Sequence, residues 1–104
     1  MLRIYPVMLE TVSRIRPSLG LIERKDPDLA RQLRRASSSF VLNTGEGMYS
    51  RGRNRGARYS TALGSAREAL SCLEFAHAMF GIPLDAGVAK DLDRIIATLV
   101  KLTA

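Results

Sequence analysis

The spacing of the apolar residues constrains the fold of this chain more than any other feature. In four segments they recur three or four positions apart, which places them on one face of a helix, and no segment shows the period of two typical of a half-buried strand. Because each helix has an apolar stripe to bury, the pattern predicts an all-α, antiparallel up-and-down four-helix bundle. With 104 residues, we expect one domain spanning residues 1–104.

The first apolar stripe runs from Ile4 to Ile22, and Pro17 interrupts it. Proline lacks a backbone N–H and clashes with the carbonyl four residues earlier. We therefore expect a kink or break in this helix between Ser13 and Arg16.

The second helix should begin with Asp26 as its N-cap and Pro27 at the first helical position, where the missing N–H costs nothing. Its apolar stripe contains one polar residue, Asn43. A polar side chain on a packing seam is costly unless it is hydrogen-bonded, and it often fixes register or oligomeric state.

Residues Tyr49–Arg58 lack apolar periodicity and contain two glycines, so they are expected to form the connection to the third helix. That helix should run from about Ala57 to Phe80 and end at Gly81, with Pro83 beyond it. It carries two apolar stripes, and the second consists mostly of small residues. A helix of this kind requires packing partners on two sides.

Asp85 is the expected N-cap of the fourth helix, whose seam has a strict four-three alternation. Ile96 and Val100 lie beside that seam. Since one bundle cannot bury these side chains together with the second stripe of the third helix, we expect a homo-oligomer. The seam positions are Val88, Leu92, Ile95, Leu99 and Leu102.

Positive charge is concentrated in the middle of the chain. The net charge is +6, and the segment from Arg31 to Arg67 holds eight arginines and a single acid, Glu46. Clustered cations favour a polyanionic partner through phosphate neutralisation and counterion release. The alternative interpretation is a solvated loop that only aids solubility.

Several classes of function are excluded by composition and motifs. One cysteine and one histidine cannot form an intrachain disulfide or an ordinary zinc site, so neither a metal nor a cofactor is expected. The glycines Gly47, Gly52 and Gly56 do not form a phosphate loop, because no Gly-Lys-Ser/Thr follows them. The absence of a signal-peptide pattern and of a long apolar run predicts a soluble, cytoplasmic protein without a membrane partner.

Four blocks in the middle of the chain match a known pattern: Gln32-Leu33-Arg34-Arg35-Ala36-Ser37, Asn43-Thr44-Gly45-Glu46-Gly47, Gly64-Ser65-Ala66-Arg67-Glu68 and Phe80-Gly81-Ile82. In order and spacing they resemble the four-helix-bundle proteins first noticed as reading frames inside intervening sequences of bacterial 23S rRNA genes. The resemblance covers about half of the chain. The sequence departs from the family pattern at Thr44-Gly45, where the family prefers Ile-Ala, and in the proline-interrupted first segment.

The resemblance implies an up-and-down bundle that assembles into a homopentamer and has no enzymatic activity. It also implies kinship with the basic accessory proteins of diversity-generating retroelements, which are pentamers that bind a reverse transcriptase and nucleic acid. The fold follows from such a resemblance more directly than the function does.

Four polar residues in the matching blocks could support chemistry: Asn43, Glu46, Ser65 and Glu68. A catalytic interpretation pairs Glu46 and Glu68 as acid and base. Carboxylates on neighbouring helices more often pair with arginine, and Arg34, Arg35, Arg51 and Arg67 are available. We therefore assign the four polar residues, with Arg34 and Arg35, a structural role and expect no catalytic residue. Cys72 and His77 are five positions apart and do not face each other, which excludes a nucleophile and base pair.

The arginine-rich connection combines phosphate-binding cations with two flanking aromatic rings, as single-stranded nucleic-acid binders do. We therefore predict binding of RNA or single-stranded DNA that is led by the phosphate backbone and weakly selective for sequence. The alternative is a scaffold whose arginines dock an acidic protein, such as a reverse transcriptase. The predicted binding residues are Arg31, Tyr49, Arg51, Arg53, Arg55, Arg58 and Tyr59.

Overall fold

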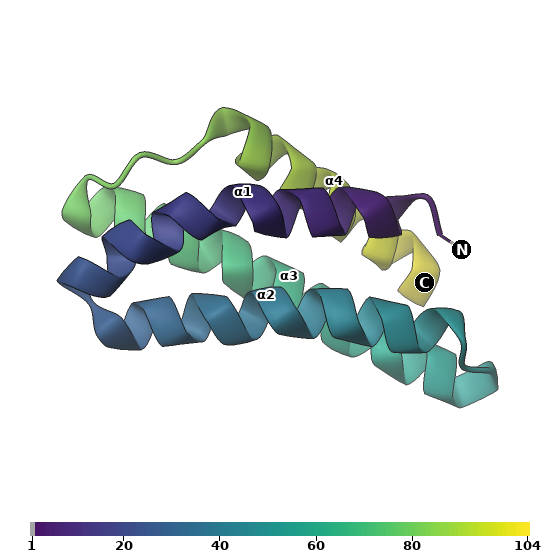
Figure 1. Ribbon diagram of the computed structural model, residues 1–104. Coiled ribbons are helices and arrows are strands. Elements are labelled where there is room, and N and C mark those ends of the chain that lie inside the picture. Colours follow the sequence, from purple (N-terminus) through teal and green to yellow (C-terminus); the bar gives the residue numbers. More distant parts are fainter. Residues whose placement is uncertain (1) are drawn as a thin grey trace.

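The computed structural model describes residues 2–104, which form four helices joined by short connections (Figure 1). They are α1 (Ile4–Lys25), α2 (Pro27–Met48), α3 (Gly52–Phe80) and α4 (Ala86–Thr103). The predicted all-α, antiparallel four-helix bundle is confirmed. It measures 42 × 23 × 20 Å, and none of its helices between residues 2 and 104 is long and apolar enough to cross a membrane.

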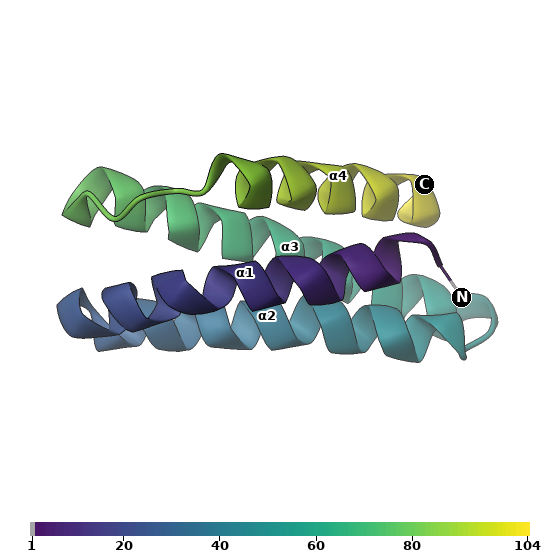
Figure 2. The ribbon, with the colours of Figure 1, turned by 45° about the horizontal axis from the view of Figure 1, so that its top comes forward.

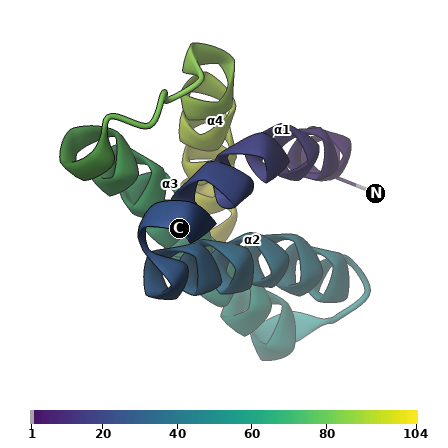
Figure 3. The ribbon, with the colours of Figure 1, turned by 60° about the vertical axis from the view of Figure 1, so that its left-hand side comes forward.

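The helices pack in chain order around a common core (Figures 2 and 3). The most extensive interface joins α2 to α3, while α1 lies against α2, and α4 lies against α3 and α1. The α2–α3 turn and both ends of the chain lie at the same end of the bundle (Figure 1). The α1–α2 turn and the α3–α4 connection lie at the opposite end.

Each helix contributes its apolar stripe to the core. Most of the large side chains come from α1, α2 and α4; α3 contributes Tyr59 and Leu73 together with buried alanines that allow its neighbours to approach closely. Burial of each large side chain stabilises the fold by about 1.5–3 kcal/mol. The core centres on Met8, Ile15, Ile22, Leu33, Phe40, Leu92, Ile95 and Leu99, with Ala62, Ala66, Ala69 and Ala76 from α3.

Helix α1 continues through Pro17, so of the two predicted outcomes the break is wrong and the kink stays a prediction. Both Pro17 and Ser13, whose carbonyl loses its hydrogen bond, are exposed, and water can satisfy that carbonyl. On the opposite face Ile15 and Ile22 are buried and hold the two halves of the helix against the core. Packing on one face therefore overrides the proline on the other.

The predicted helix ends are confirmed at three places. The side chain of Asp26 accepts a hydrogen bond from the backbone N–H of Leu29 at 3.0 Å, and Asp85 accepts one from Val88 at 3.0 Å. Helix α3 ends at Gly81, which adopts the left-handed conformation with φ of 68°. Gly81 has this role because residues with a Cβ are strained there.

The predicted connection Tyr49–Arg58 is too long, and this prediction is corrected. Helix α3 begins at Gly52 rather than near Ala57, and the turn after α2 comprises only residues 49–51. The first turns of α3 extend past the core and expose nearly every side chain, so they have no apolar periodicity to detect. Gly52 itself has a φ of 57°, which closes the turn.

Several large apolar side chains remain outside the core. Leu102, predicted on the α4 seam, is 37% exposed because it lies in the last turn of the helix. Phe75 and Met79 on α3 are 51% and 64% exposed, and Phe75 packs edge-to-face on Phe80 with ring centroids 6.4 Å apart. The expectation that one bundle cannot bury the second stripe of α3 is wrong, because Ala62, Ala69, Cys72 and Ala76 are at most 5% exposed. Beside the α4 seam, Ile96 is partly buried and Val100 is 41% exposed.

Candidate nucleic-acid interface

Four arginines surround the α2–α3 turn, and we call this surface the basic end: Arg51, Arg53, Arg55 and Arg58. All four are exposed. Arg51 is the N-cap of α3, and the other three lie on the first two turns of that helix. Since consecutive residues are rotated by about 100°, Arg55 and Arg58 share one side of α3 and Arg53 lies toward the other.

Two of these arginines are held by polar contacts to neutral groups. The Nε of Arg55 donates to the carbonyl oxygen of Ser50 at 2.9 Å, and Nη1 of Arg58 donates to Oδ1 of Asn43 at 3.2 Å. No ion pair within residues 2–104 includes an arginine of the basic end. Helix α3 also begins without a side-chain cap or an acidic residue in its first turn. The positive charge at this end is therefore uncompensated.

The two tyrosines that flank this segment have different environments. Tyr49 is 86% exposed, so its ring is accessible. Tyr59 is only 4% exposed, and its ring packs so closely on Gly47 that a Cβ at that position would lie 2.5 Å from Cε1 of the ring. The assignment of Tyr59 as a stacking residue is therefore corrected: it belongs to the core, because its position on α3 faces α2.

Arg31 does not join the basic end. It forms an ion pair with Asp28 in the first turns of α2, and the helical rise places it roughly 25 Å from the α2–α3 turn. Arg34 lies 4.0 Å from Glu23 at the same end of the bundle. Arg35 and Arg67 are exposed. The eight arginines of the segment from Arg31 to Arg67 are thus separated along the length of the α2–α3 pair.

Asn43 and Ser65 meet through a third residue, Ser39, between α2 and α3. The hydroxyl of Ser65 donates to Oγ of Ser39 at 2.7 Å, and Nδ2 of Asn43 donates to the Ser39 carbonyl at 3.0 Å. The polar residue on the α2 seam is therefore satisfied by hydrogen bonds. Sequence reasoning missed Ser39, although its position four residues before Asn43 places it on the same face of α2.

Glu46 and Glu68 are exposed and do not pair with Arg34 or Arg35. Among the ion pairs of residues 2–104, neither glutamate occurs. The expected pairing is corrected, since Arg34 lies nearer to Glu23 in the adjoining α1. Within the same described range, no three His, Cys, Asp or Glu residues are placed to hold a metal ion.

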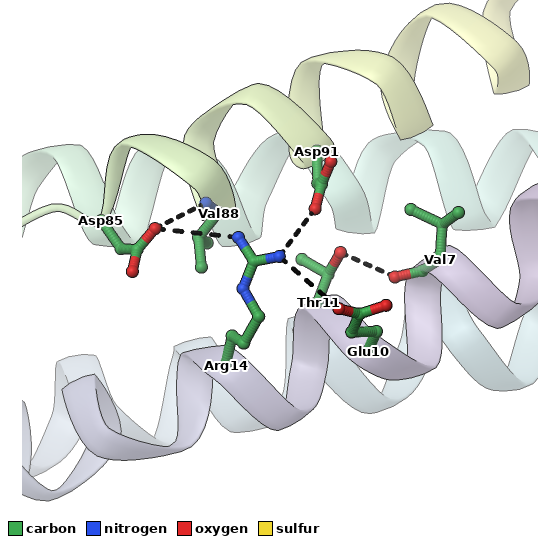
Figure 4. A network of polar contacts seen from close by, with 7 residues as sticks. All are labelled: Val7, Glu10, Thr11, Arg14, Asp85, Val88 and Asp91. Atoms are coloured by element: carbon green, nitrogen blue, oxygen red, sulfur yellow. Dashed lines mark hydrogen bonds and ion pairs between the residues drawn. The ribbon is translucent and has the colours of Figure 1, made fainter.

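Sequence reasoning also missed Arg14, which links α1 to α4 (Figure 4). Its Nη1 donates to Oδ2 of Asp91 at 3.1 Å and lies 3.9 Å from Oε1 of Glu10, while Nη2 lies 3.7 Å from Oδ1 of Asp85. The Arg14 side chain is 35% exposed. No short motif marks this arginine, because its carboxylate partners come mainly from a distant helix.

Cys72 and His77 on α3 also have structural positions. Cys72 is 5% exposed, and burial, followed by the negative charge of Glu68, raises the pKa of its thiol. A thiol that stays protonated is a poor nucleophile. The Nδ1 of His77 lies 2.9 Å from the carbonyl oxygen of Ile82, so the tautomer protonated there ties the end of α3 to the following connection.

No protein-family model matches the chain, and no curated protein is significantly similar to it. Among solved structures, the chain is similar to a protein of unknown function from the S23 ribosomal protein family of Bacteroides thetaiotaomicron. The two share 20% sequence identity and superpose with a TM-score of 0.85 over 96% of this chain and 97% of the other. This likeness shows that the fold extends over almost the whole of both chains.

Proposed function

We propose that this chain is a non-enzymatic member of the four-helix-bundle family found in 23S rRNA intervening sequences. In this proposal it forms a homo-oligomeric ring, most simply a pentamer, and binds RNA or single-stranded DNA through its basic end. The proposal extends to a role as accessory to a reverse transcriptase or to another RNA process. The family assignment rests on the four sequence blocks, and it is consistent with the similar fold of the S23-family protein.

The observation that carries the binding proposal is the uncompensated charge of the basic end. Among the residues that the structure describes, its arginines form no ion pair, whereas Arg14, Arg31 and Arg34 each form at least one, and the sequence has no acid from residue 47 to 67. A phosphate backbone would neutralise these arginines and release counterions. The start of α3 adds backbone N–H groups without a side-chain cap, which further favours an anion beside them.

The ring is supported by apolar surface that the bundle itself does not cover. Phe75 and Met79 on α3, together with Val100 on α4, are between 41% and 64% exposed. In a ring each subunit would repeat the basic end, and weak phosphate contacts along one strand would combine as avidity. Light scattering tests this part of the proposal: we expect an oligomer, and a monomer mass at micromolar concentration would contradict it.

The binding test replaces Arg51, Arg53 and Arg55 together by alanine. Affinity for RNA and single-stranded DNA should fall. The negative slope of log affinity against log salt should become less steep, by about 0.7–0.9 for each phosphate that the variant no longer neutralises. Helicity and oligomer mass should not change, because these side chains lie outside the core. The matched control replaces Arg16, Arg24 and Lys25 on α1, which removes the same charge from another surface.

Wild-type affinity and an unchanged salt slope in the first variant would contradict nucleic-acid binding at this end. An equal loss in both variants would indicate a response to net charge alone. A second candidate function, a scaffold that docks an acidic protein, is favoured by the exposed Phe75 and Met79. It predicts a purified protein free of nucleic acid, which the ultraviolet absorbance ratio measures readily because the chain contains no Trp and three Tyr.

A further inference from the structure

A surface hollow adjoins the basic end, between the start of α1 and the last turns of α2. Its volume is about 360 Å³, enough to hold one planar base. It is lined by Tyr5, Leu42, Gly45, Glu46, Met48 and Tyr49. Apart from Glu46 the lining is apolar or aromatic, and Leu42 and Tyr49 are 63% and 86% exposed. Exposed apolar side chains that gather around a hollow often mark a site for a ligand or partner.

Gly45 keeps the ring of Tyr5 open to this hollow. A Cβ at Gly45 would lie 3.5 Å from Cε1 and 3.6 Å from the hydroxyl oxygen of Tyr5, which is ordinary contact distance. Because glycine has no side chain, that space is empty and the ring remains accessible from the α2 side. Two tyrosines, Tyr5 and Tyr49, therefore belong to one hollow although they are 44 positions apart in the sequence.

The hollow continues toward the arginines of the basic end. Met48 lines it and also lines a smaller adjoining hollow, together with Leu2, Arg55 and Tyr59. The guanidinium of Arg55 is positioned there by its 2.9 Å hydrogen bond to the Ser50 carbonyl. An apolar, aromatic surface is thus contiguous with Arg55, which forms no ion pair within residues 2–104.

We infer that this hollow binds an unpaired base of a single-stranded nucleic acid while Arg51, Arg55 and Arg58 hold its phosphates. The inference rests on the nucleic-acid binding proposed above and adds the chemical class of ligand. Aromatic rings beside cations bind single strands by stacking, which every base permits. A base in a duplex is already stacked and paired, so it cannot enter the hollow. The Glu46 carboxylate at the rim can accept a hydrogen bond from an exocyclic amino group.

The test compares two single-stranded probes with the same phosphates: an oligothymidylate of about ten nucleotides and a strand of equal length built from abasic sites. The wild-type protein should bind the oligothymidylate roughly tenfold more tightly than the abasic strand. An oligouridylate should show the same preference, because stacking does not use the 2′-hydroxyl. Equal affinity for the abasic strand and both base-bearing strands would overturn the inference.

Three substitutions assign this preference to the hollow. Tyr49→Ala should abolish it while leaving affinity for the abasic strand and its salt slope unchanged, and Tyr49→Phe should retain it. Gly45→Ala should also reduce the preference, because its methyl group occupies the space beside Tyr5. It should nevertheless raise the melting temperature, since alanine favours a helix more than glycine does. Leu21→Ala, at an exposed apolar residue of α1 outside the hollow, should change neither the preference for bases nor the affinity for the abasic strand.

The outcomes separate this inference from the proposal on which it rests. Salt-dependent binding without any preference for bases would contradict the hollow but support the basic end. No binding of either probe would contradict the nucleic-acid proposal itself. If Tyr49→Ala lowers the oligomer mass, the hollow is an interface between copies of this chain, and the inference is overturned.

Discussion

Arginine has two different environments in this bundle. Arg14 is partly buried and lies near three carboxylates, Glu10, Asp85 and Asp91, from α1 and from the start of α4 (Figure 4). The arginines of the basic end are exposed; Arg55 and Arg58 donate to neutral oxygens, and none of the four forms an ion pair within residues 2–104. Arg14, whose charge is neutralised within the chain, holds α1 against α4. Charge without an internal partner contributes little to folding and remains available to a ligand.

The largest predicted effect is a loss of unfolding free energy at the contact between Gly47 and Tyr59, beside the basic end. Gly47→Ala would force a methyl group against the ring of Tyr59, because the new Cβ would lie 2.5 Å from its Cε1. Overpacking of this kind costs about 1–3 kcal/mol of unfolding free energy, which exceeds the gain of about 0.5–1 kcal/mol from replacing a helical glycine. Urea denaturation should show the loss.

Gly64→Ala is the matched control for this substitution. Gly64 lies on α3, and no neighbouring atom lies within 4 Å of the position that a Cβ would occupy, so alanine should stabilise the protein there. Equal stabilisation by both substitutions would show that Tyr59 moves freely. The packing of the Tyr59 ring against α2 would then not fix the position of the first turns of α3.

The second prediction tests the comparison of the arginines directly. Arg14→Gln should reduce the free energy of unfolding by about 1 kcal/mol, because it leaves three neighbouring carboxylates without their cation. Arg53→Gln should change it by less than about 0.5 kcal/mol, as expected for an exposed side chain without a partner. Urea denaturation of the two variants measures both values. Similar losses would remove the distinction between the two environments.

The third prediction uses Gly87, at the start of α4. A Cβ at this position would clash with Nη2 of Arg14, so Gly87→Ala should displace the guanidinium and weaken its contacts with α4. In the Arg14→Gln background that conflict is absent and only the approach to Oδ1 of Asp85, at 3.1 Å, remains, so the same substitution should be less destabilising there by about 0.5 kcal/mol or more. A double-mutant cycle measures the coupling. Additive effects would show that Arg14 does not occupy the observed position.

The sequence predicts the bundle because apolar spacing and capping residues are local signals. Asp26 and Asp85 cap their helices through their own side chains, and Gly81 ends α3 through its backbone conformation. Pro17 is also a local signal, but the helix break that it predicts does not occur, because the packing of Ile15 and Ile22 holds both halves of α1 against the core. The start of α3 is missed because exposed turns have no apolar pattern.

The candidate site is less predictable, because it depends on which residues the tertiary structure brings together. Tyr59 and Tyr49 are equivalent in the sequence as flanking aromatic residues, yet one is buried against Gly47 and the other is exposed. Tyr5 joins the hollow beside Tyr49 from a different helix. Arg34 lies closest to Glu23 of α1, not to the glutamates of the matching blocks. Each of these outcomes depends on contacts between helices, which periodicity does not specify.

The smallest predicted effect is the response of stability to salt, and it has opposite signs at the two arginine environments. Raising the ionic strength from about 0.05 M to 0.5 M shortens the screening length severalfold, which weakens the Arg14 ion pairs and relieves repulsion within the basic end. Because the chain carries a net charge of +6, repulsion should dominate, and the wild-type protein should gain a few tenths of a kcal/mol. The Arg51, Arg53 and Arg55 triple alanine variant should gain less, and Arg14→Gln should gain more. Urea denaturation at both ionic strengths measures these differences. An identical response of all three proteins would mean that neither arginine environment contributes to the salt dependence of the unfolding free energy.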